Sequence, residues 1–132
     1  MSDIALYAGD IMTDNLITVS PDEPATKAAS IMVDNKISGL PVVGQDGKLH
    51  GIITEMDLLG LLREHNGEGK YVYDFMTKEV IAFNIEDSII EISEFFMKSK
   101  IRRVPVINNN SEIVGVVSRR DILKQILKQR HS

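Results

Sequence analysis

The chain has 132 residues, a net charge of −4, 43% apolar residues and no cysteine. This length fits one compact domain or two very small ones that share a core, and the apolar content excludes a disordered chain. The absence of cysteine excludes disulfides, thiolate chemistry and cysteine-bound zinc.

The predicted elements follow the same order in both halves of the chain, with turn-forming residues between the paired strands. The first half is expected to form a β-rich segment at 16–19, a helix with Asp22 or Glu23 near its cap and Pro24 at an early position, strands at 40–43 and 49–53, and a helix over 55–64. The second half is expected to form a β-rich segment at 80–83, a helix capped by Asp87 or Ser88, strands at 104–107 and 113–117, and a helix over 119–130.

The two halves are copies of one unit, because a shift of 64 residues aligns them without a gap. Residues 10–13 then fall on 74–77, 36–43 on 100–107, and 51–59 on 115–123. The matches gather at Pro, Gly, Asp and Met-Thr positions, where chance is a poor explanation. We therefore predict two repeats, residues 8–64 and 72–130, joined by a linker-like stretch at 66–69.

A repeat of this size has one apolar sheet face and two one-sided helices, and cannot bury much surface alone. Two copies related by a pseudo-twofold axis, with their sheets packed together and their helices outside, would share a core. The predicted fold class is therefore α/β (in the α+β sense), with two tandem β-α-β-β-α repeats that form one intramolecular pair rather than independent domains.

The most informative segments are 51–57 and 115–121. Each is a strand with a glycine that runs into a hydroxyl residue, with an Asp three positions later at the start of a helix. One interpretation is a capping box, which satisfies free N–H groups at a helix start. The other is a nucleotide site, since a helix start attracts phosphate, the carboxylate of an Asp can accept both ribose hydroxyls, and the glycine lets another backbone or a ligand approach.

These segments, taken in register, resemble the CBS motif, whose tandem pair is called a Bateman module. The resemblance covers residues 8–128 and rests on the Asp-x-Met-Thr starts, the Leu-Pro-Val-Val and Val-Pro-Val-Ile strands, and the two Gly-x-x-[Ser/Thr]-x-x-Asp ends. It implies binding of AMP, ADP or ATP, or of S-adenosylmethionine, in clefts between the two repeats. The motif Asp would contact ribose, the Ser or Thr would lie near phosphate, and small or apolar residues would sandwich adenine.

Carried over residue by residue, the resemblance predicts two pockets, each built across the pair. The main pocket would comprise Thr13, Ile17, Thr18, Ile37, Arg102, Arg103, Ser118, Arg120 and Asp121. The second pocket would comprise Ser38, Gly39, Thr54, Asp57, Thr77, Ala82 and Ile101.

The basic residues of the second half have two interpretations. Residues 1–64 hold 4 basic and 10 acidic side chains, whereas residues 65–132 hold 11 and 9. The excess is local, at residues 98–103 and 119–120, and such a cluster is either a solvated face or a phosphate site. Since Arg102 and Arg103 replace an uncharged Ser-Gly pair of the first repeat, and 119–120 replace Glu-Met, we expect the main pocket to prefer phosphorylated ligands.

Other function classes are less well supported by the sequence. No nucleophile–base pair and no glycine-rich phosphate loop is recognisable, and we expect neither catalysis nor a cofactor. His50, His65 and His131 lack metal-ligand spacing, so we expect no metal site, and we expect His50 to be a partly buried structural residue. A basic face that binds nucleic acid remains an alternative, although a mildly acidic chain is a poor general binder of nucleic acid.

The function expected from the sequence is that of a stand-alone regulatory module that binds an adenosine compound and signals to a partner protein of unknown identity. No signal-peptide pattern is present, and no apolar run approaches the roughly 18 residues that cross a bilayer, so we expect a cytoplasmic protein with no membrane contact. We also expect a homodimer formed through helices whose apolar positions are left over. Those positions are Leu58, Leu59, Leu61, Leu62, Ile122, Leu123, Ile126 and Leu127.

Overall fold

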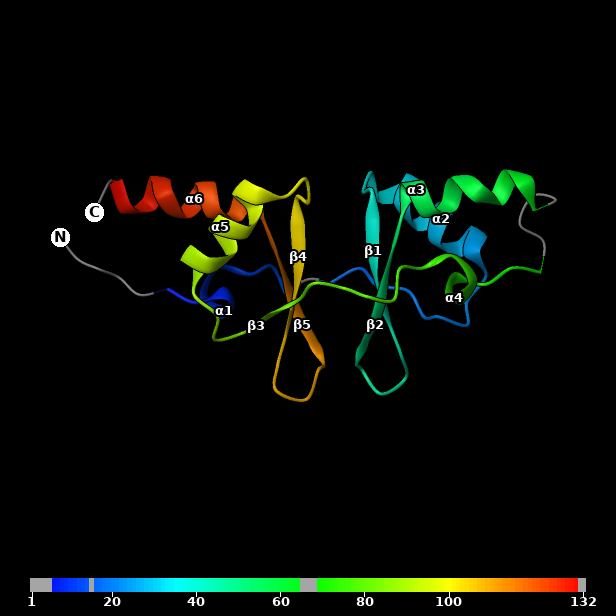
Figure 1. Ribbon diagram of the computed structural model, residues 1–132, viewed down its shortest axis with the longest axis horizontal. Coiled ribbons are helices and arrows are strands. Elements are labelled where there is room, and N and C mark those ends of the chain that lie inside the picture. The colour runs from blue at the N-terminus through cyan, green and yellow to red at the C-terminus, as the bar shows by residue number, and fades with distance from the viewer. Residues whose placement is uncertain (1–5, 15, 65–68, 131–132) are drawn as a thin grey trace. The chain divides into compact units, whose positions relative to one another are not determined.

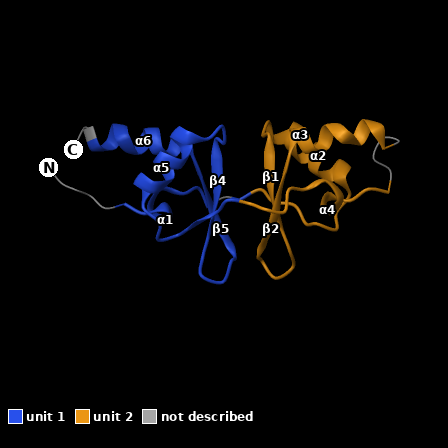
Figure 2. Ribbon diagram, in the orientation of Figure 1, with its two compact units in different colours: residues 1–16, 81–132 blue, residues 17–80 orange. Residues whose placement is uncertain are grey.

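The computed structural model describes residues 6–14, 16–64 and 69–130 (Figure 1), and the chain divides into two compact units (Figure 2). Unit 1 is built from Met1–Leu16 and Ile81–Ser132, and unit 2 from Ile17–Val80. Unit 1 contains α1 (Ala8–Ile11), β3 (Phe83–Asn84), α5 (Ile89–Lys98), β4 (Arg103–Ile107), β5 (Ile113–Ser118) and α6 (Arg119–Arg130). Unit 2 contains α2 (Ala25–Asn35), β1 (Gly39–Val43), β2 (Leu49–Thr54), α3 (Glu55–Leu58), the 3₁₀ helix η1 (Leu59–Arg63) and α4 (Val72–Phe75).

Unit 2 is a β-hairpin with its helices on one side (Figure 2). Strands β1 and β2 pair antiparallel, with Gly39 opposite Thr54. Alternate residues of the strands are buried, as the period of two in a half-buried strand requires. The buried cluster consists of Val19, Ala25, Ala28, Met32, Leu40, Val42, Ile53, Leu58, Leu61 and Val72.

Unit 1 has the same plan, with β3 added to the sheet. Strands β4 and β5 pair antiparallel, with Arg103 opposite Ser118, and β3 pairs parallel to β4. Helices α1, α5 and α6 lie on one side of this sheet (Figure 2). The buried cluster consists of Ala8, Ile92, Phe96, Val104, Val106 and Val117. The mixed α/β fold and the four predicted hairpin strands are confirmed, each within one residue at its ends.

Each compact unit contains the opening segment of the other repeat. In α1, the Ala8 N–H donates to the Asp87 carbonyl at 2.8 Å, and in α4 the Val72 N–H donates to the Glu23 carbonyl at 2.9 Å. Ala8 and Val72 are both fully buried, so each opening turn is part of a core. The repeat limits 8–64 and 72–130 remain a prediction about the duplicated sequence, because the compact units follow other limits.

The sequence did not predict α1 and α4, because each is a single helical turn, too short for an apolar period to show. In both turns an Asp at the third position accepts the N–H of the preceding Tyr. Asp10 Oδ2 lies 2.8 Å from Tyr7 N, and Asp74 Oδ2 lies 2.9 Å from Tyr71 N. The Asp-x-Met-Thr segments therefore begin with a capped turn.

The predicted β-rich segments are shorter than expected. Within 16–19 only Val19 forms a bridge, parallel to Val42, and of 80–83 only Phe83 lies in a strand. The Val19 N–H donates to the Pro41 carbonyl at 3.1 Å, and the Val19 carbonyl accepts from Val43 N at 2.8 Å. Since the segment meets the sheet at one residue, β propensity before that residue has no ladder to join.

The helix ends differ in part from the prediction. The helix expected over 55–64 is α3 followed by the 3₁₀ helix η1, with Gly60, a poor helix former, where the helix tightens. The N-cap of α2 is Pro24, directly after Asp22 and Glu23, and it caps through no side-chain bond. The expected cap Ser88 of α5 is confirmed by the Ile90 N–H, which donates to its Oγ at 3.1 Å.

Among the described residues, every helix falls short of the length and apolar character that crossing a membrane needs.

The two motif glycines make room for the Met-Thr segments. A Cβ atom on Gly51 would lie 2.6 Å from the Thr77 carbonyl oxygen, and a Cβ atom on Gly115 would meet the Met12 side chain. At both places a backbone pair forms across the gap: Ile52 with Thr77, and Val116 with Thr13. The glycines are thus explained by the close approach of the chain itself.

We predict that Gly51→Ala is more destabilising than Gly115→Ala. In Gly51→Ala the new methyl group pushes against a backbone oxygen that accepts the Ile52 N–H at 2.9 Å, whereas in Gly115→Ala it meets a flexible methionine side chain. Overpacking costs about 1–3 kcal/mol, and we expect Gly51→Ala at the upper end and Gly115→Ala at the lower end. Urea unfolding of the two variants measures both losses of stability. An equal or inverted order would contradict the explanation from the close approach to Thr77.

Candidate functional site

In unit 2 the turn from β2 into α3 is built by Thr54 and Asp57. Asp57 Oδ2 accepts the Thr54 N–H at 2.9 Å and the Thr54 hydroxyl at 3.0 Å, while Thr54 Oγ1 accepts the Asp57 N–H at 3.3 Å. This is a capping box, and it fixes the backbone where the strand ends. Among the described residues, Asp57 Oδ1 accepts no hydrogen bond and is free to meet a ligand.

In unit 1 the turn from β5 into α6 repeats this geometry with Ser118 and Asp121. Asp121 Oδ2 accepts the Ser118 N–H at 2.8 Å, and Ser118 Oγ accepts the Asp121 N–H at 3.1 Å. Here the hydroxyl proton has no acceptor within the described ranges, in contrast to that of Thr54. The capping interpretation is therefore correct for both motifs, and it occupies only one oxygen of each carboxylate.

Each motif is tied to the segment that precedes its partner strand. The Glu55 N–H donates to the Ser38 carbonyl at 2.9 Å in unit 2, and the Arg119 N–H donates to the Arg102 carbonyl at 3.0 Å in unit 1. The opening segments join from the other side, since Thr77 pairs with Ile52 and Thr13 with Val116. Three separate stretches of sequence thus converge at each strand-to-helix turn.

The side chains around the two turns differ in charge. The side chains of Arg102, Arg103 and Arg120 are exposed, and within the part of the chain that the structure describes none of these side chains forms an ion pair or a hydrogen bond. At the equivalent positions of unit 2 stand Ser38, Gly39 and Met56, whose side chains carry no charge. The turn of unit 1 thus has unpaired cations nearby, and the turn of unit 2 has none at these positions.

Arg119 has a different environment from the other arginines. Its Nε donates to the Ile101 carbonyl at 3.0 Å, and its Nη2 donates to the carbonyls of Ser99 at 2.8 Å and Phe96 at 3.3 Å. The guanidinium carbon also lies 5.9 Å from the centre of the Phe96 ring. Sequence reasoning missed this role, because an arginine next to a motif looks the same whether it contacts phosphate or backbone carbonyls.

The structure brings together part of each predicted pocket. Six members of the main pocket lie in unit 1: Thr13, Arg102, Arg103, Ser118, Arg120 and Asp121. Five members of the second pocket lie in unit 2: Ser38, Gly39, Thr54, Asp57 and Thr77. The remaining members belong to the other unit in each case, namely Ile17, Thr18 and Ile37 for the main pocket and Ala82 and Ile101 for the second. Their part in the pockets stays a prediction.

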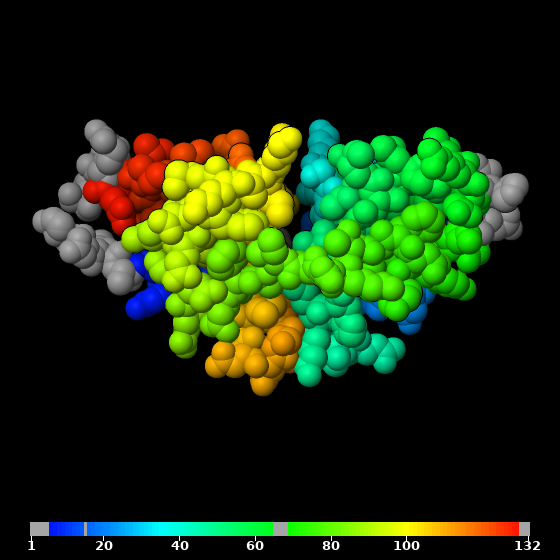
Figure 3. Space-filling model, viewed as in Figure 1, coloured from blue at the N-terminus to red at the C-terminus, as the bar shows by residue number. Residues whose placement is uncertain are grey.

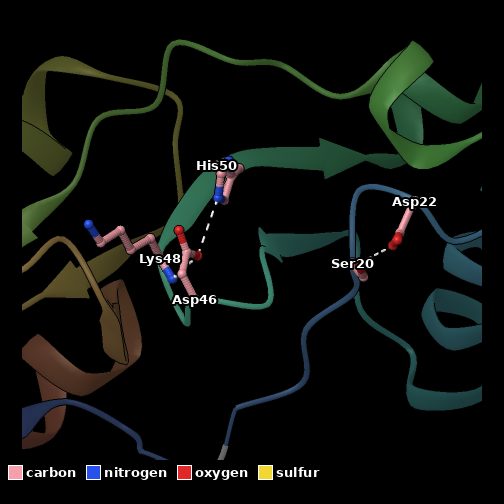
Figure 4. Close-up of polar contacts among 5 residues, drawn as sticks. All are labelled: Ser20, Asp22, Asp46, Lys48 and His50. Carbon is pink, nitrogen blue, oxygen red and sulfur yellow. Dashed lines mark hydrogen bonds and ion pairs between the residues drawn. The ribbon is translucent and has the colours of Figure 1, made fainter.

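A second polar cluster lies at the β1–β2 turn, at the other end of β2 from the Thr54–Asp57 turn (Figure 4). His50 Nε2 lies 3.4 Å from Asp46 Oδ1, and the His50 side chain is 45% exposed, so the expectation of a partly buried histidine is wrong. The pKa of Asp46 is lowered, first because its carboxylate accepts the Lys48 N–H and then because His50 is near, while desolvation opposes the shift. Figure 4 also shows the Ser20 hydroxyl, which donates to Asp22.

These residues do not assemble into a metal site. Within the described ranges, no three His, Asp or Glu side chains come together as metal ligands. His65 and His131 lie outside the described residues, as do residues 66–68 of the linker-like stretch.

Comparison with known proteins places the chain among relatives of two kinds. Inosine-5'-monophosphate dehydrogenase of Methanocaldococcus jannaschii is 34% identical over 118 residues, which are 89% of this chain and 23% of the enzyme. The CBS domain-containing protein YhcV of Bacillus subtilis is 32% identical over 114 residues, 86% of this chain and 80% of that protein. The chain spans about a quarter of the length of the first curated relatives that it matches, all of them enzymes.

Solved structures match the chain along nearly its whole length. CBSX2 of Arabidopsis thaliana has a TM-score of 0.88 and 25% identity, covering 97% of this chain and 99% of that one. CBSX2 in complex with AMP has a TM-score of 0.84 and 27% identity, covering 94% and 98%. The CBS domain pair of protein MJ0100, in complex with 5'-methylthioadenosine and S-adenosyl-L-methionine, has a TM-score of 0.77 and 28% identity, covering 95% and 98%.

The duplicated strand–turn–helix motif, with its exchanged opening segments, defines a tandem-repeat α/β module. The model of the CBS domain matches residues 8–64 and 72–128. The chain therefore belongs to the CBS domain family, and the resemblance noted in the sequence is confirmed.

We predict that Asp57→Ala and Asp121→Ala each lower the free energy of unfolding by about 1 kcal/mol, the usual loss for a removed cap. Asp57→Asn and Asp121→Asn should cost less, because the amide oxygen can still accept the backbone N–H. Thermal unfolding without any ligand measures this order. If the alanine variants were as stable as the parent, the capping role of the two carboxylates would be wrong.

Proposed function

We propose that this chain is a regulatory module that binds adenosine nucleotides and transmits their presence to a partner protein. The observation that carries the proposal is the duplicated turn, in which Asp57 and Asp121 each spend one carboxylate oxygen on the cap and keep the other. AMP in a complex of CBSX2, 27% identical and similar in fold, supports the same ligand class.

Ribose recognition follows from the chemistry of the free oxygen. A carboxylate oxygen has two lone pairs and accepts strong hydrogen bonds from hydroxyl groups. Because the capping bonds hold Asp57 and Asp121 in place, little side-chain entropy is lost when a diol binds. The sugar would thus be held by a feature common to both repeats.

Phosphate recognition is assigned to unit 1. Arg102, Arg103 and Arg120 are exposed cations without a protein partner in the described ranges, and the Ser118 hydroxyl proton is without an acceptor there. One charge-assisted hydrogen bond to phosphate contributes about 1.5–3 kcal/mol, which is about tenfold or more in affinity. In unit 2, Glu55 would oppose a phosphate. The preference of unit 1 should therefore grow with phosphate number and weaken with salt.

Regulation requires that the ligand distinguish two states of the module. A ligand shifts an equilibrium only by its difference in affinity for the two arrangements. The nucleotide would therefore favour one arrangement of the module, and the partner protein would bind that arrangement differently.

S-adenosylmethionine is a second candidate ligand, since the MJ0100 CBS pair, 28% identical, was solved with it and with 5'-methylthioadenosine. Both compounds present the same ribose diol but no phosphate. The arginines of unit 1 would then contribute little beyond a contact with the methionine carboxylate. Measured affinities for adenosine, AMP and S-adenosylmethionine separate the two candidates. A nucleotide site should bind AMP more tightly than adenosine, whereas a site for S-adenosylmethionine should bind that compound more tightly than AMP.

We predict that Asp121→Asn weakens AMP binding at least tenfold, with a smaller effect of Asp57→Asn on the phosphorylated ligand. The asparagine keeps an acceptor for the cap but turns the other oxygen into an N–H₂ donor, which cannot accept a ribose hydroxyl. Titration calorimetry with adenosine, AMP and ATP provides the measurement.

The matched controls are Asp10→Asn and Asp74→Asn. These carboxylates make the same capping bond in α1 and α4 but belong to neither predicted pocket, so their variants should bind like the parent. If Asp57→Asn abolished tight AMP binding and Asp121→Asn did not, the two pockets would be assigned the wrong way round. If the parent bound none of the three compounds, the proposed function would fail.

We further propose that the module is a homodimer formed through α3, η1 and α6. Large apolar side chains remain exposed on these helices: Met56 at 76%, Leu59 at 63%, Leu62 at 82%, Leu123 at 59%, Ile126 at 48% and Leu127 at 59%. Three of the positions expected to be left over instead pack in or against the cores, namely Leu58, Leu61 and Ile122. Exposed apolar side chains gathered on the helices of a unit in this way are typical of an interface.

We predict a dimeric mass in sedimentation velocity at tens of micromolar protein. Leu62→Glu combined with Leu127→Glu should give a monomer that still folds, because both side chains are exposed. Val33→Glu is the control, since Val33 is 76% exposed on α2, outside these helices. A monomeric parent would refute the dimer.

A further inference from the structure

The end of α5 is closed in an unusual way. Its last carbonyls have no intrahelical partner, and its C-cap Ser99 is extended, with φ −127° and ψ 169°, rather than left-handed. The carbonyls of Phe96 and Ser99 are instead satisfied by the guanidinium of Arg119, which comes from the start of α6. The space-filling view shows the end of α5 and the following segment, in yellow, at the surface (Figure 3).

The equivalent helix of unit 2 ends in a backbone closure, and the Asn35 side chain adds a bond to the Ile31 carbonyl one turn earlier. Its C-cap Lys36 is left-handed, with φ 55°, its N–H reaches the carbonyls of Met32 and Val33, and the Ile37 N–H donates to Met32 O at 3.0 Å. This is the common backbone closure of a helix, which needs no side chain. Glu55, the residue at the position of Arg119, could not accept such a role, because a carboxylate has no proton to give a carbonyl.

The Arg119 side chain therefore does in unit 1 what the backbone does in unit 2. Together with its own N–H, which donates to Arg102 O, Arg119 binds four carbonyls between Phe96 and Arg102. The planar fork of a guanidinium suits several acceptors at fixed angles, and its charge suits the negative end of a helix. The segment held in this way leads directly into Arg102 and Arg103.

We infer that Arg119 is a positioning residue that holds Arg102 and Arg103 in place for the phosphate of the ligand. The inference rests on the proposed function and deepens it, because it assigns the phosphate contact to Arg102 and Arg103 and excludes Arg119 from it. The Arg119 guanidinium is already bound to carbonyls. Its effect on phosphate is therefore indirect, through the order of the segment that it binds.

The test measures the affinity for AMP divided by the affinity for adenosine, which isolates the phosphate contribution. In Arg119→Gln this ratio should fall about tenfold, while adenosine binding changes less than twofold. Arg119→Lys should also lower the ratio, since an ammonium keeps the charge but cannot span the same carbonyls. Lys124→Gln, which removes the same charge from the same helix, should leave the ratio unchanged.

The double variant Arg103→Ala/Arg119→Gln separates positioning from a direct contact. If Arg119 acts through Arg103, the double variant should lose little more than Arg103→Ala alone, whereas two independent phosphate contacts would add. Amide hydrogen exchange without ligand gives a further readout: residues 99–103 should exchange faster in Arg119→Gln and Arg119→Lys than in the parent.

The outcomes distinguish this inference from the proposed function. A parent that binds AMP more tightly than adenosine, with the same ratio in Arg119→Gln, would overturn the role of Arg119 and leave the proposed function standing. A full ratio in Arg119→Lys would mean that charge alone matters and would overturn positioning. A parent that binds neither compound would overturn both, whatever the exchange rates are.

Discussion

A short backbone pair between a Met-Thr segment and a glycine-containing strand is the contact on which both units depend. Thr13 pairs with Val116 in unit 1, and Thr77 pairs with Ile52 in unit 2, with N···O distances of 2.8–2.9 Å. Because the pair needs a close approach, the neighbouring strand residue has to be glycine. Through this contact the opening turn of each repeat joins the core formed by the rest of the other repeat, near the turn that holds the motif Asp.

Capping and ligand recognition do not compete at the two motif turns. A helix start leaves N–H groups without intrahelical partners. Asp57 and Asp121 each accept a backbone N–H there, and they do so with Oδ2 alone. The bond that stabilises the helix also fixes the direction of the second oxygen, so the capping role is compatible with the proposed contact to ribose. From the sequence alone, helix capping and ribose binding were alternatives, because a residue pattern does not distinguish the two oxygens of one carboxylate.

The regular parts of the fold were predictable from the sequence, and the exchanged parts were not. The 64-residue repeat, the hairpin strands and the helix over 119–130 follow from periodicity and turn residues, which act locally. The strand expected at 16–19 depends on a partner far along the chain, and only Val19 meets one. Likewise, the contacts of Arg119 depend on how α5 ends. Ser99, whose carbonyl Arg119 binds, lies 20 residues before Arg119 in the sequence, and no local pattern predicts such a contact.

The two repeats share a backbone and differ in the side chains that would meet a charged ligand. The bonds of the opening turns, the capping boxes and the link from each motif to the preceding segment recur at the same 64-residue shift. At that shift, however, Glu55 aligns with Arg119, and the pair Ser38-Gly39 aligns with Arg102-Arg103. Under the proposed function, the duplicated backbone would therefore supply two equivalent places for ribose, while charge would restrict phosphate to one. Because the helix before Arg102 lacks a backbone closure, two of its terminal carbonyls, those of Phe96 and Ser99, accept hydrogen bonds from the Arg119 side chain instead.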